Sequence, residues 1–312
     1  MRVLFWGTPE FALPSLRALL GEAHDVVAVV TQPDRPAGRG RKLRAPPVKQ
    51  LALEEKLMVL QPEQPYGAEF LETMRALDAE ISVVVAYGQI LKREVLDVPG
   101  FGTINVHASL LPGLRGAAPI NWAIERGHDE TGVTIMRIAE RLDAGPILHQ
   151  VREPITDEET ASDLATRLSE LGAEALIEAL ALMEMDSIEE EEQEHDRATY
   201  APKLTREDAH IDWIRSAVEL GRHIRALDSK PGAWSRWHDE DIKLYRPTPM
   251  PDNAHDATPG TVLEHSDADG GLLIACGSGA ILVREVKLAG KRRMTVAEWA
   301  RGRGAVVGDL FH

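Results

Sequence analysis

Cysteine is almost absent from this chain of 312 residues, since Cys276 is its only one. A single thiol excludes an intramolecular disulfide and a cysteine-based metal cluster. The eleven histidines are never spaced as His-x-x-x-His or His-Glu-x-x-His, so no metal site is expected. No apolar run approaches the ~20 residues that a membrane-spanning helix needs, and no basic, apolar leader opens the chain. We therefore expect a cytoplasmic protein without a metal.

The glycine fingerprint of dinucleotide-binding folds is missing as well. The first predicted strand ends in Gly7-Thr8-Pro9 rather than Gly-x-Gly-x-x-Gly, which disfavours a nucleotide-binding dehydrogenase. The chain does contain 44% hydrophobic and 27% charged residues, the usual makeup of a globular protein. Its length allows one large or two medium domains.

Short apolar strands alternate with amphipathic helices in the first part of the chain. Such alternation is typical of a parallel sheet covered by helices. We predict a Rossmann-like α/β domain at residues 1–185, closed by a helix over 161–185. The other predicted elements are strands at 2–6, 26–31, 81–86 and 102–106 and helices at 11–21, 45–55 and 68–77.

The character of the chain changes after a run of acids. Residues 184–196 are mostly acidic and repel one another, so we predict an extended linker at 186–205 without a catalytic role. Beyond it, a helix over 217–227 precedes short β-type segments separated by glycine, proline and aspartate. These segments, at 233–237, 242–246, 260–263, 272–275 and 280–286, predict a small barrel or sandwich at 206–312.

Three polar residues of the first part suggest chemistry at a carbonyl group. Asn105 and His107 stand two apart at the end of a predicted strand, so their side chains share one face. Asp143 follows later, on a Leu-Asp-Ala-Gly turn. An amide can donate to an oxyanion, an imidazole can move a proton, and a carboxylate can orient the imidazole and raise its pKa. Each residue alone is more typical of a structural role, but the combination favours catalysis.

A basic segment interrupts an otherwise acidic chain. The formal net charge of −15 argues against nucleic-acid binding, yet residues 35–49 hold six cations and no acid. Prolines and glycines there disfavour a regular helix or strand. The segment is either a solvated surface loop or, as the charge separation favours, a mobile phosphate-binding loop. Its cations are Arg35, Arg39, Arg41, Lys42, Arg44 and Lys49.

A second basic cluster lies near the C-terminal end. RNA binding and solubility explain it equally well. Its members are Lys287, Lys291, Arg292, Arg293, Arg301 and Arg303.

Longer motifs around the three polar residues resemble the 10-formyltetrahydrofolate-dependent formyltransferases. The string Asn-x-His-x-Ser-Leu-Leu-Pro at 105–112 is similar to a signature of that superfamily, and Leu-Asp-x-Gly at 142–145 accompanies it. Gln-Pro-Asp-Arg-Pro at 32–36 and Arg-Gly-Ala-Ala-Pro-Ile at 115–120 resemble the branch that formylates methionyl-tRNA. The resemblance runs almost from end to end.

The resemblance implies a reaction and a set of contacts. It implies formyl transfer from 10-formyltetrahydrofolate to the α-amino group of methionyl-initiator tRNA, with Asn105, His107 and Asp143 as catalytic residues. It also implies an OB-like tRNA-binding domain at 206–312 and tRNA contacts at Arg115 and the basic segment. We expect a monomer. The folate pocket would be lined by Ala86, Tyr87, Gly88, Gln89, Ile90, Leu91, Ser109, Leu110, Leu111 and Pro112.

Two stretches depart from the family pattern. Gly113 and Leu114 stand where members usually carry a basic residue and an aromatic one, and Arg141 stands where a glycine is usual. The acceptor-side contacts and the shape of the folate loop are therefore open.

Sibling enzymes would share the three catalytic residues. They include formyltransferases for glycinamide ribonucleotide or amino sugars, and formyltetrahydrofolate hydrolase, and they should lack the basic segment and the barrel. A non-catalytic tRNA-binding protein would carry a broken motif, whereas this motif is intact.

Overall fold

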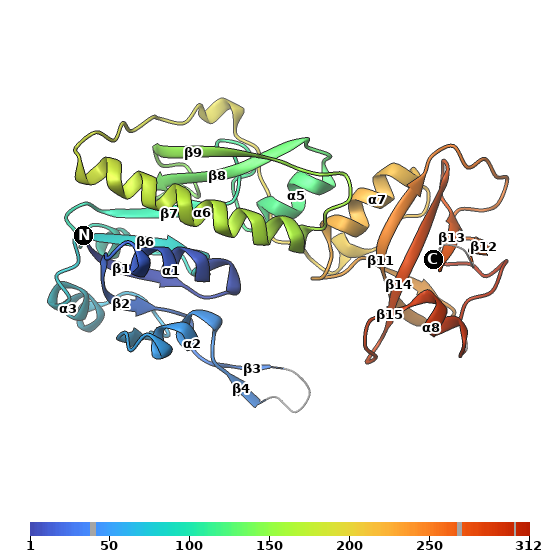
Figure 1. Cartoon of the computed structure of the whole chain (residues 1–312), viewed down its shortest axis with the longest axis horizontal. Coiled ribbons are helices and arrows are strands. Elements are labelled where there is room, and N and C mark those ends of the chain that lie inside the picture. The colour runs from blue at the N-terminus through green and yellow to red at the C-terminus, as the bar shows by residue number, and fades with distance from the viewer. Residues whose placement is uncertain (38–41, 267–269, 303) are drawn as a thin grey trace. The chain divides into compact units, whose positions relative to one another are not determined.

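A computed structural model describes residues 1–312 except 38–41, 267–269 and 303 (Figure 1). The chain divides into two compact units, and it passes between them more than once. Unit 1 comprises Met1–Pro119, Glu130–Pro154 and Ala165–Ala201, and unit 2 comprises Ile120–Asp129, Ile155–Leu164 and Pro202–His312. The segment expected as a linker at 186–205 is thus not a separate tether, because most of it packs within unit 1.

Unit 1 is built on a seven-stranded sheet of order β5-β2-β1-β6-β7-β8-β9 (Figure 1). The first five strands in this order pair in parallel, whereas β8 and β9 pair antiparallel. The predicted Rossmann-like fold is confirmed, with an antiparallel edge that was not predicted. The strands are β1 (Arg2–Gly7), β2 (Asp25–Val30), β5 (Val59–Leu60), β6 (Ile81–Val85), β7 (Thr103–His107), β8 (Glu130–Arg137) and β9 (Ile147–Pro154).

Amphipathic helices pack on this sheet. The long helix α6 reaches β7 and β8 through Gly172, where an added Cβ would lie 3.0 Å from Val106 Cγ1. The inner strands β1 and β6 are almost wholly buried, as a covered parallel sheet requires. The helices are η1 (Glu10–Ala12), α1 (Leu13–Gly21), α2 (Pro47–Glu54), α3 (Ala68–Ala76), α4 (Arg93–Leu96) and α6 (Ala161–Glu184), whose first residues lie in unit 2.

The basic segment contains two strands, contrary to the prediction. The strands β3 (Arg35–Ala37) and β4 (Lys42–Arg44) pair antiparallel as a hairpin, whereas α2 begins at Pro47, within the helix predicted at 45–55. Backbone pairing thus overrides the effect of Pro36, which lies within β3. Arg39 and Arg41 lie outside the described residues.

Unit 2 contains an antiparallel sheet of order β10-β11-β14-β13-β12, with β15 paired to β14. The tail joins its two ends: the backbone of His312 exchanges hydrogen bonds with Arg236 of β10, and Val262 of β12 donates to Asp309 O. This arrangement agrees with the predicted barrel. The strands are β10 (Trp234–Trp237), β11 (Glu240–Met250), β12 (Val262–Ser266), β13 (Gly271–Ala275), β14 (Ala280–Leu288) and β15 (Met294–Thr295).

Three helices and two short helical segments complete the described structure. Helix α7 (Ala217–Ala226) begins at a capping box made by Ser216 and Glu219, and its apolar face enters the core of unit 2. Cys276 lies in the same core, where burial raises the pKa of its thiol to about 12. None of the described helices is long and apolar enough to cross a bilayer. The remaining elements are α5 (Pro119–Glu125), α8 (Val296–Ala300), η2 (His195–Arg197) and η3 (Glu207–Ala209).

Candidate active site

His107 is the last residue of β7, an inner strand of the unit 1 sheet between β6 and β8. Its side chain is 6% exposed, and its Nε2 lies 3.1 Å from the carbonyl oxygen of Leu114. A carbonyl oxygen only accepts, so Nε2 carries a proton and donates it. The other ring nitrogen, Nδ1, lies 3.8 Å from Asp143 Oδ2. The structure thus brings His107 and Asp143 together, as the sequence predicted.

Burial lowers the pKa of His107 below 6.5, although the Asp143 charge and the hydrogen bond to Leu114 O both act to raise it. The prediction of a raised pKa was therefore wrong. A buried imidazolium loses the stabilisation that water gives to its charge, and a carboxylate 3.8 Å away does not compensate for this loss. The imidazole rests neutral near neutral pH, with an unprotonated Nδ1 facing the acid.

Asp143 occupies a turn that folds back over the sheet. Its φ is +47°, in the left-handed region that aspartate tolerates better than most residues. Its Oδ2 accepts a hydrogen bond of 2.8 Å from Gly116 N. Gly145 makes the turn possible, because an added Cβ would lie 2.1 Å from Arg137 O. The carboxylate is therefore oriented by the backbone N–H of Gly116 and by the tight turn at Gly145.

Asn105 precedes His107 by two residues and lies on the same face of β7. Its side chain is partly buried, and its amide has no hydrogen-bond partner within the described parts of the chain. An amide held on a central strand without a partner is available to donate to a substrate oxygen.

The first predicted group of folate residues follows β6. The loop is tied to its neighbours, since Thr8 Oγ1 donates to Tyr87 O at 2.8 Å and Gln89 Nε2 donates to Gln32 Oε1 at 3.1 Å. Burial raises the pKa of Tyr87 to about 12. Ile90 is 89% exposed. This loop lies beside the point where the strand order reverses between β1 and β6, the usual ligand position in such sheets.

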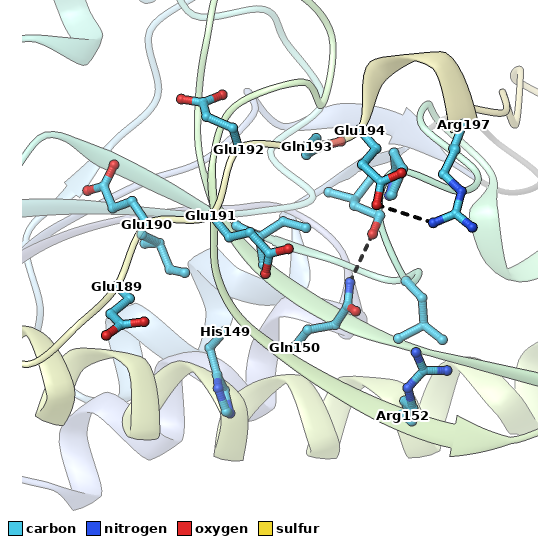
Figure 2. A pocket seen from close by; sticks show the side chains of 15 residues that line it. His149, Gln150, Arg152, Glu189, Glu190, Glu191, Glu192, Gln193, Glu194 and Arg197 are labelled. Carbon is cyan, nitrogen blue, oxygen red and sulfur yellow. Dashed lines mark hydrogen bonds and ion pairs between the residues drawn. The ribbon is translucent and has the colours of Figure 1, made fainter.

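The second predicted group, Ser109–Pro112, lies elsewhere. Leu111 N donates to Thr134 Oγ1 of β8 at 3.2 Å, and Gln150 Nε2 of β9 donates to Leu111 O at 3.1 Å. Its residues 110–112 line a cleft of about 810 Å³ together with β9 and residues 189–197 (Figure 2). The two groups thus form hydrogen bonds to segments on opposite sides of β7.

The predicted tRNA-binding cations differ in their surroundings. Lys49 Nζ pairs with Asp34 at 2.8 Å, so an acid just outside the segment neutralises it. Arg35 donates to Gln32 Oε1 at 3.3 Å, whereas Arg44 is exposed. Arg115 is 2% exposed, which is the opposite of the expected availability for phosphate.

Sequence reasoning missed the role of the acidic segment. Residues 189–201, which we call the strap, pair with β9 of the same unit: Glu191 exchanges two backbone hydrogen bonds of 2.8 Å with Ile147. Figure 2 shows the acidic side chains 189–192 along the strap, with His149, Gln150 and Arg152 on the facing β9. The buried residue of the run is Gln193, and its lack of charge was the one available signal.

A second histidine–carboxylate pair lies in unit 2. His223 of α7 is 4% exposed, and its Nδ1 lies 3.1 Å from Glu125 Oε2 of α5. Arg215 donates to Glu125 Oε1 at 3.0 Å. Burial alone would raise the pKa of Glu125, but the hydrogen bonds and charges of His223 and Arg215 lower it. In the described part of the chain, no three His, Cys, Asp or Glu side chains are arranged to hold a metal ion.

Residues 1–180 match the formyl transferase family, and residues 203–304 match the formyl transferase C-terminal domain. Methionyl-tRNA formyltransferase of Acetivibrio thermocellus is 42% identical over 311 residues, 100% of this chain and 99% of that protein. The enzyme of the same name from Methylococcus capsulatus is 47% identical and covers 96% of both chains. HypX from Aquifex aeolicus in complex with tetrahydrofolic acid shares the fold, with a TM-score of 0.66 and 18% identity over 100% of this chain and 51% of that one. The chain belongs to the formyl transferase family and, within it, to the methionyl-tRNA formyltransferases.

Proposed function

We propose that this protein transfers the formyl group of 10-formyltetrahydrofolate to the α-amino group of methionyl-initiator tRNA, in the cytoplasm. The observation that carries the proposal is His107 Nδ1 facing Asp143 Oδ2 at 3.8 Å, on the same strand face as Asn105, whose amide has no partner among the described residues. The full-length similarity to methionyl-tRNA formyltransferases supports the choice of acceptor. The expected monomer stays a prediction.

Asn105 acts on the carbonyl oxygen. Bound 10-formyltetrahydrofolate supplies an electrophilic formyl carbonyl, whose oxygen gains negative charge as the amine attacks. The Asn105 amide donates to this oxygen, and one such donor lowers a barrier by ~3 kcal/mol. Because the amide has no internal partner among the described residues, it need not break a hydrogen bond first.

His107 accepts the proton of the attacking amine and later donates it to the leaving nitrogen. The attacking amine must lose a proton, and Nδ1 of the neutral imidazole is the nitrogen that can take it, since Nε2 already donates to Leu114 O. The new imidazolium then lies 3.8 Å from the Asp143 carboxylate, which stabilises it. The same Nδ1 proton is the one that His107 returns to the leaving nitrogen.

The loop 86–91 fits a folate. It presents the apolar side chain of Ile90 to solvent, 89% exposed, and Leu142 beside the catalytic Asp143 is 61% exposed. A loop at the reversal of strand order in such a sheet is a usual place for a ligand, and its exposed apolar side chain suits a planar, partly apolar one. We assign folate binding to this loop together with Ser109–Pro112, which β8 and β9 hold in place through Leu111.

The basic hairpin supports tRNA as the acceptor. Its cations stand out from a chain of net charge −15, and electrostatic contact with phosphates makes binding salt-dependent. Lys49 and Arg115 contribute less to such contact, because one is paired with Asp34 and the other is buried.

One assay decides between the candidate functions. The protein is mixed with 10-formyltetrahydrofolate and charged initiator tRNA, and formyl-methionine is measured. Parallel reactions contain glycinamide ribonucleotide, a nucleotide-linked amino sugar or water alone. We expect turnover with methionyl-tRNA only; preferential turnover of another acceptor, or hydrolysis alone, would assign the chain to a sibling enzyme instead.

A second assay tests the hairpin. Replacing Arg39, Arg41 and Lys42 with alanine should raise KM for tRNA. It should also flatten the log–log salt dependence by about one unit for each phosphate that is no longer neutralised. The control is Arg75→Ala, an exposed cation of α3. An unchanged KM and salt slope in the triple variant would mean that the hairpin is only a solvated surface.

A further inference from the structure

We propose that Gln193 of the strap is a positioning residue for the reaction, because it holds the turn that carries Asp143. The inference rests on the proposed function, since it concerns the same pair of His107 and Asp143. It assigns a task to a segment whose sequence pattern indicates only a solvated linker.

Both amide hydrogens of Gln193 are used on the Asp143 turn. Its Nε2 donates to Asp143 O at 2.9 Å and to Gly145 O at 2.7 Å. The side chain is 5% exposed, so these bonds do not compete with solvent. A non-glycine residue at φ +47° stays in that conformation when its surroundings fix it, and these two bonds fix the backbone on both sides of Ala144.

The other end of the same amide binds a buried cation. Gln193 Oε1 accepts from Arg115 Nε at 3.1 Å and from Nη2 at 2.6 Å. Arg115 has only donors, so the amide can point in one direction only, with its NH₂ toward the turn. Within the described parts of the chain, no carboxylate pairs with Arg115; its other side-chain partner is His195 Nδ1, at 2.9 Å. The guanidinium therefore locks the orientation of Gln193.

The strap also reaches the opposite flank of the histidine. Thr199 Oγ1 accepts from Leu114 N at 2.9 Å, and Leu114 O is the group that accepts from His107 Nε2 at 3.1 Å. One segment thus holds both neighbours of His107: the acid through Gln193 and the carbonyl through Thr199. The 3.8 Å separation of Nδ1 and Oδ2 depends on this segment staying in place.

Two substitutions remove the donors of Gln193 in different ways. Gln193→Glu keeps an acceptor for Arg115 but presents a carboxylate oxygen to two carbonyls, so it should fold while releasing the turn. Gln193→Met removes the donors without adding charge. We expect kcat to fall by about 10- to 100-fold in both, as for other groups that orient a catalytic side chain, and KM for both substrates to stay within about threefold. Asp196→Asn, an exposed substitution in the same strap, is the control.

Two readouts distinguish positioning from a general structural effect. In Gln193→Met, the acid limb of the kcat/KM profile should move to lower pH, because His107 loses the carboxylate that raises its pKa. At the other end of the strap, Thr199→Val should lower kcat, whereas Thr199→Ser, which keeps the hydroxyl, should restore it.

The outcomes are decisive even if one variant does not fold. A folded Gln193→Glu or Gln193→Met protein with wild-type kcat and pH profile would overturn the proposal. If the wild-type protein formylates no acceptor, the proposed function fails, but ¹⁵N shifts of the His107 ring still test the placement. They should change in the same direction in Gln193→Met and Asp143→Asn, and unchanged shifts in Gln193→Met would overturn it.

Discussion

The two units each contain a buried histidine beside a carboxylate, yet the two pairs are built differently. In unit 2, His223 and Glu125 are in direct contact at 3.1 Å, and Arg215 binds the same carboxylate. In unit 1, His107 and Asp143 stay 3.8 Å apart, and the nearby Arg115 turns to Gln193 instead.

The difference shows what separates a structural pair from the pair that we propose to be catalytic. In the unit 2 pair, the Glu125 carboxylate is bound directly by His223 Nδ1 and by Arg215, which ties α5 to α7. In the unit 1 pair, the acid is bound by a backbone N–H, and Nδ1 of the histidine is left without a direct hydrogen bond among the described residues. A histidine with an open nitrogen facing an oriented carboxylate can take up a proton during a reaction.

The sharpest way to break this comparison is to remove each histidine. His107→Gln and, at the neighbouring donor, Asn105→Ala should each lower kcat by about 10²–10³-fold. His223→Gln should leave kcat nearly unchanged. Steady-state assays with methionyl-tRNA measure this; comparable losses at both histidines would contradict the division into catalytic and structural pairs.

Removal of each acid should give the reverse ranking in stability. Glu125→Gln leaves Arg215 without its counter-charge and replaces the carboxylate that binds His223, so it should lower the free energy of unfolding by ~2 kcal/mol, less than for a fully buried pair. Asp143→Asn keeps an oxygen for Gly116 N and should cost little. Urea unfolding followed by circular dichroism compares the two, and a larger loss in Asp143→Asn would refute the ranking.

The smallest effects concern pH. The folded pKa of His107 lies below its unfolded value near 6.5, so the unfolded chain binds the proton first and stability falls as pH drops below 6.5. The folded pKa of Glu125 lies below 4.5, so its stabilisation is present above that pH and is lost as pH falls through the folded pKa.

NMR titration checks the first of these windows. His107 should titrate below 6.5 in the wild type and lower still in Asp143→Asn, because the acid raises the pKa of the imidazole. An identical pKa for His107 in the two proteins would show that the pair is not coupled.

Much of the fold follows from the sequence, since buried strands such as β6 read as continuous apolar runs. The antiparallel edge was missed because β9 is half-exposed and alternates polar with apolar residues only weakly. The strap was missed for a related reason. Its backbone pairs with Ile147, and backbone hydrogen bonds do not require a particular side-chain pattern, so a run of glutamates does not predict them.

The meeting of His107 with Asp143 was expected from the family resemblance, whereas the spacing of two places only Asn105 and His107 on one face of a strand. The sign of the pKa shift was not, since it depends on how completely other segments cover the imidazole. Burial of Arg115 was likewise hidden, because its partners Gln193 and His195 lie almost eighty residues downstream.

The solitary thiol has a practical consequence for fluorescence work. Cys276 is 1% exposed, and a pKa of about 12 keeps it protonated, so maleimide reagents find almost no thiolate there at neutral pH. A cysteine introduced on the surface, for example Leu43→Cys on the 71%-exposed side chain of β4, would then be the one reactive site. The native chain should therefore take up little dye, and a single dye at position 43 would report on the hairpin when tRNA is added.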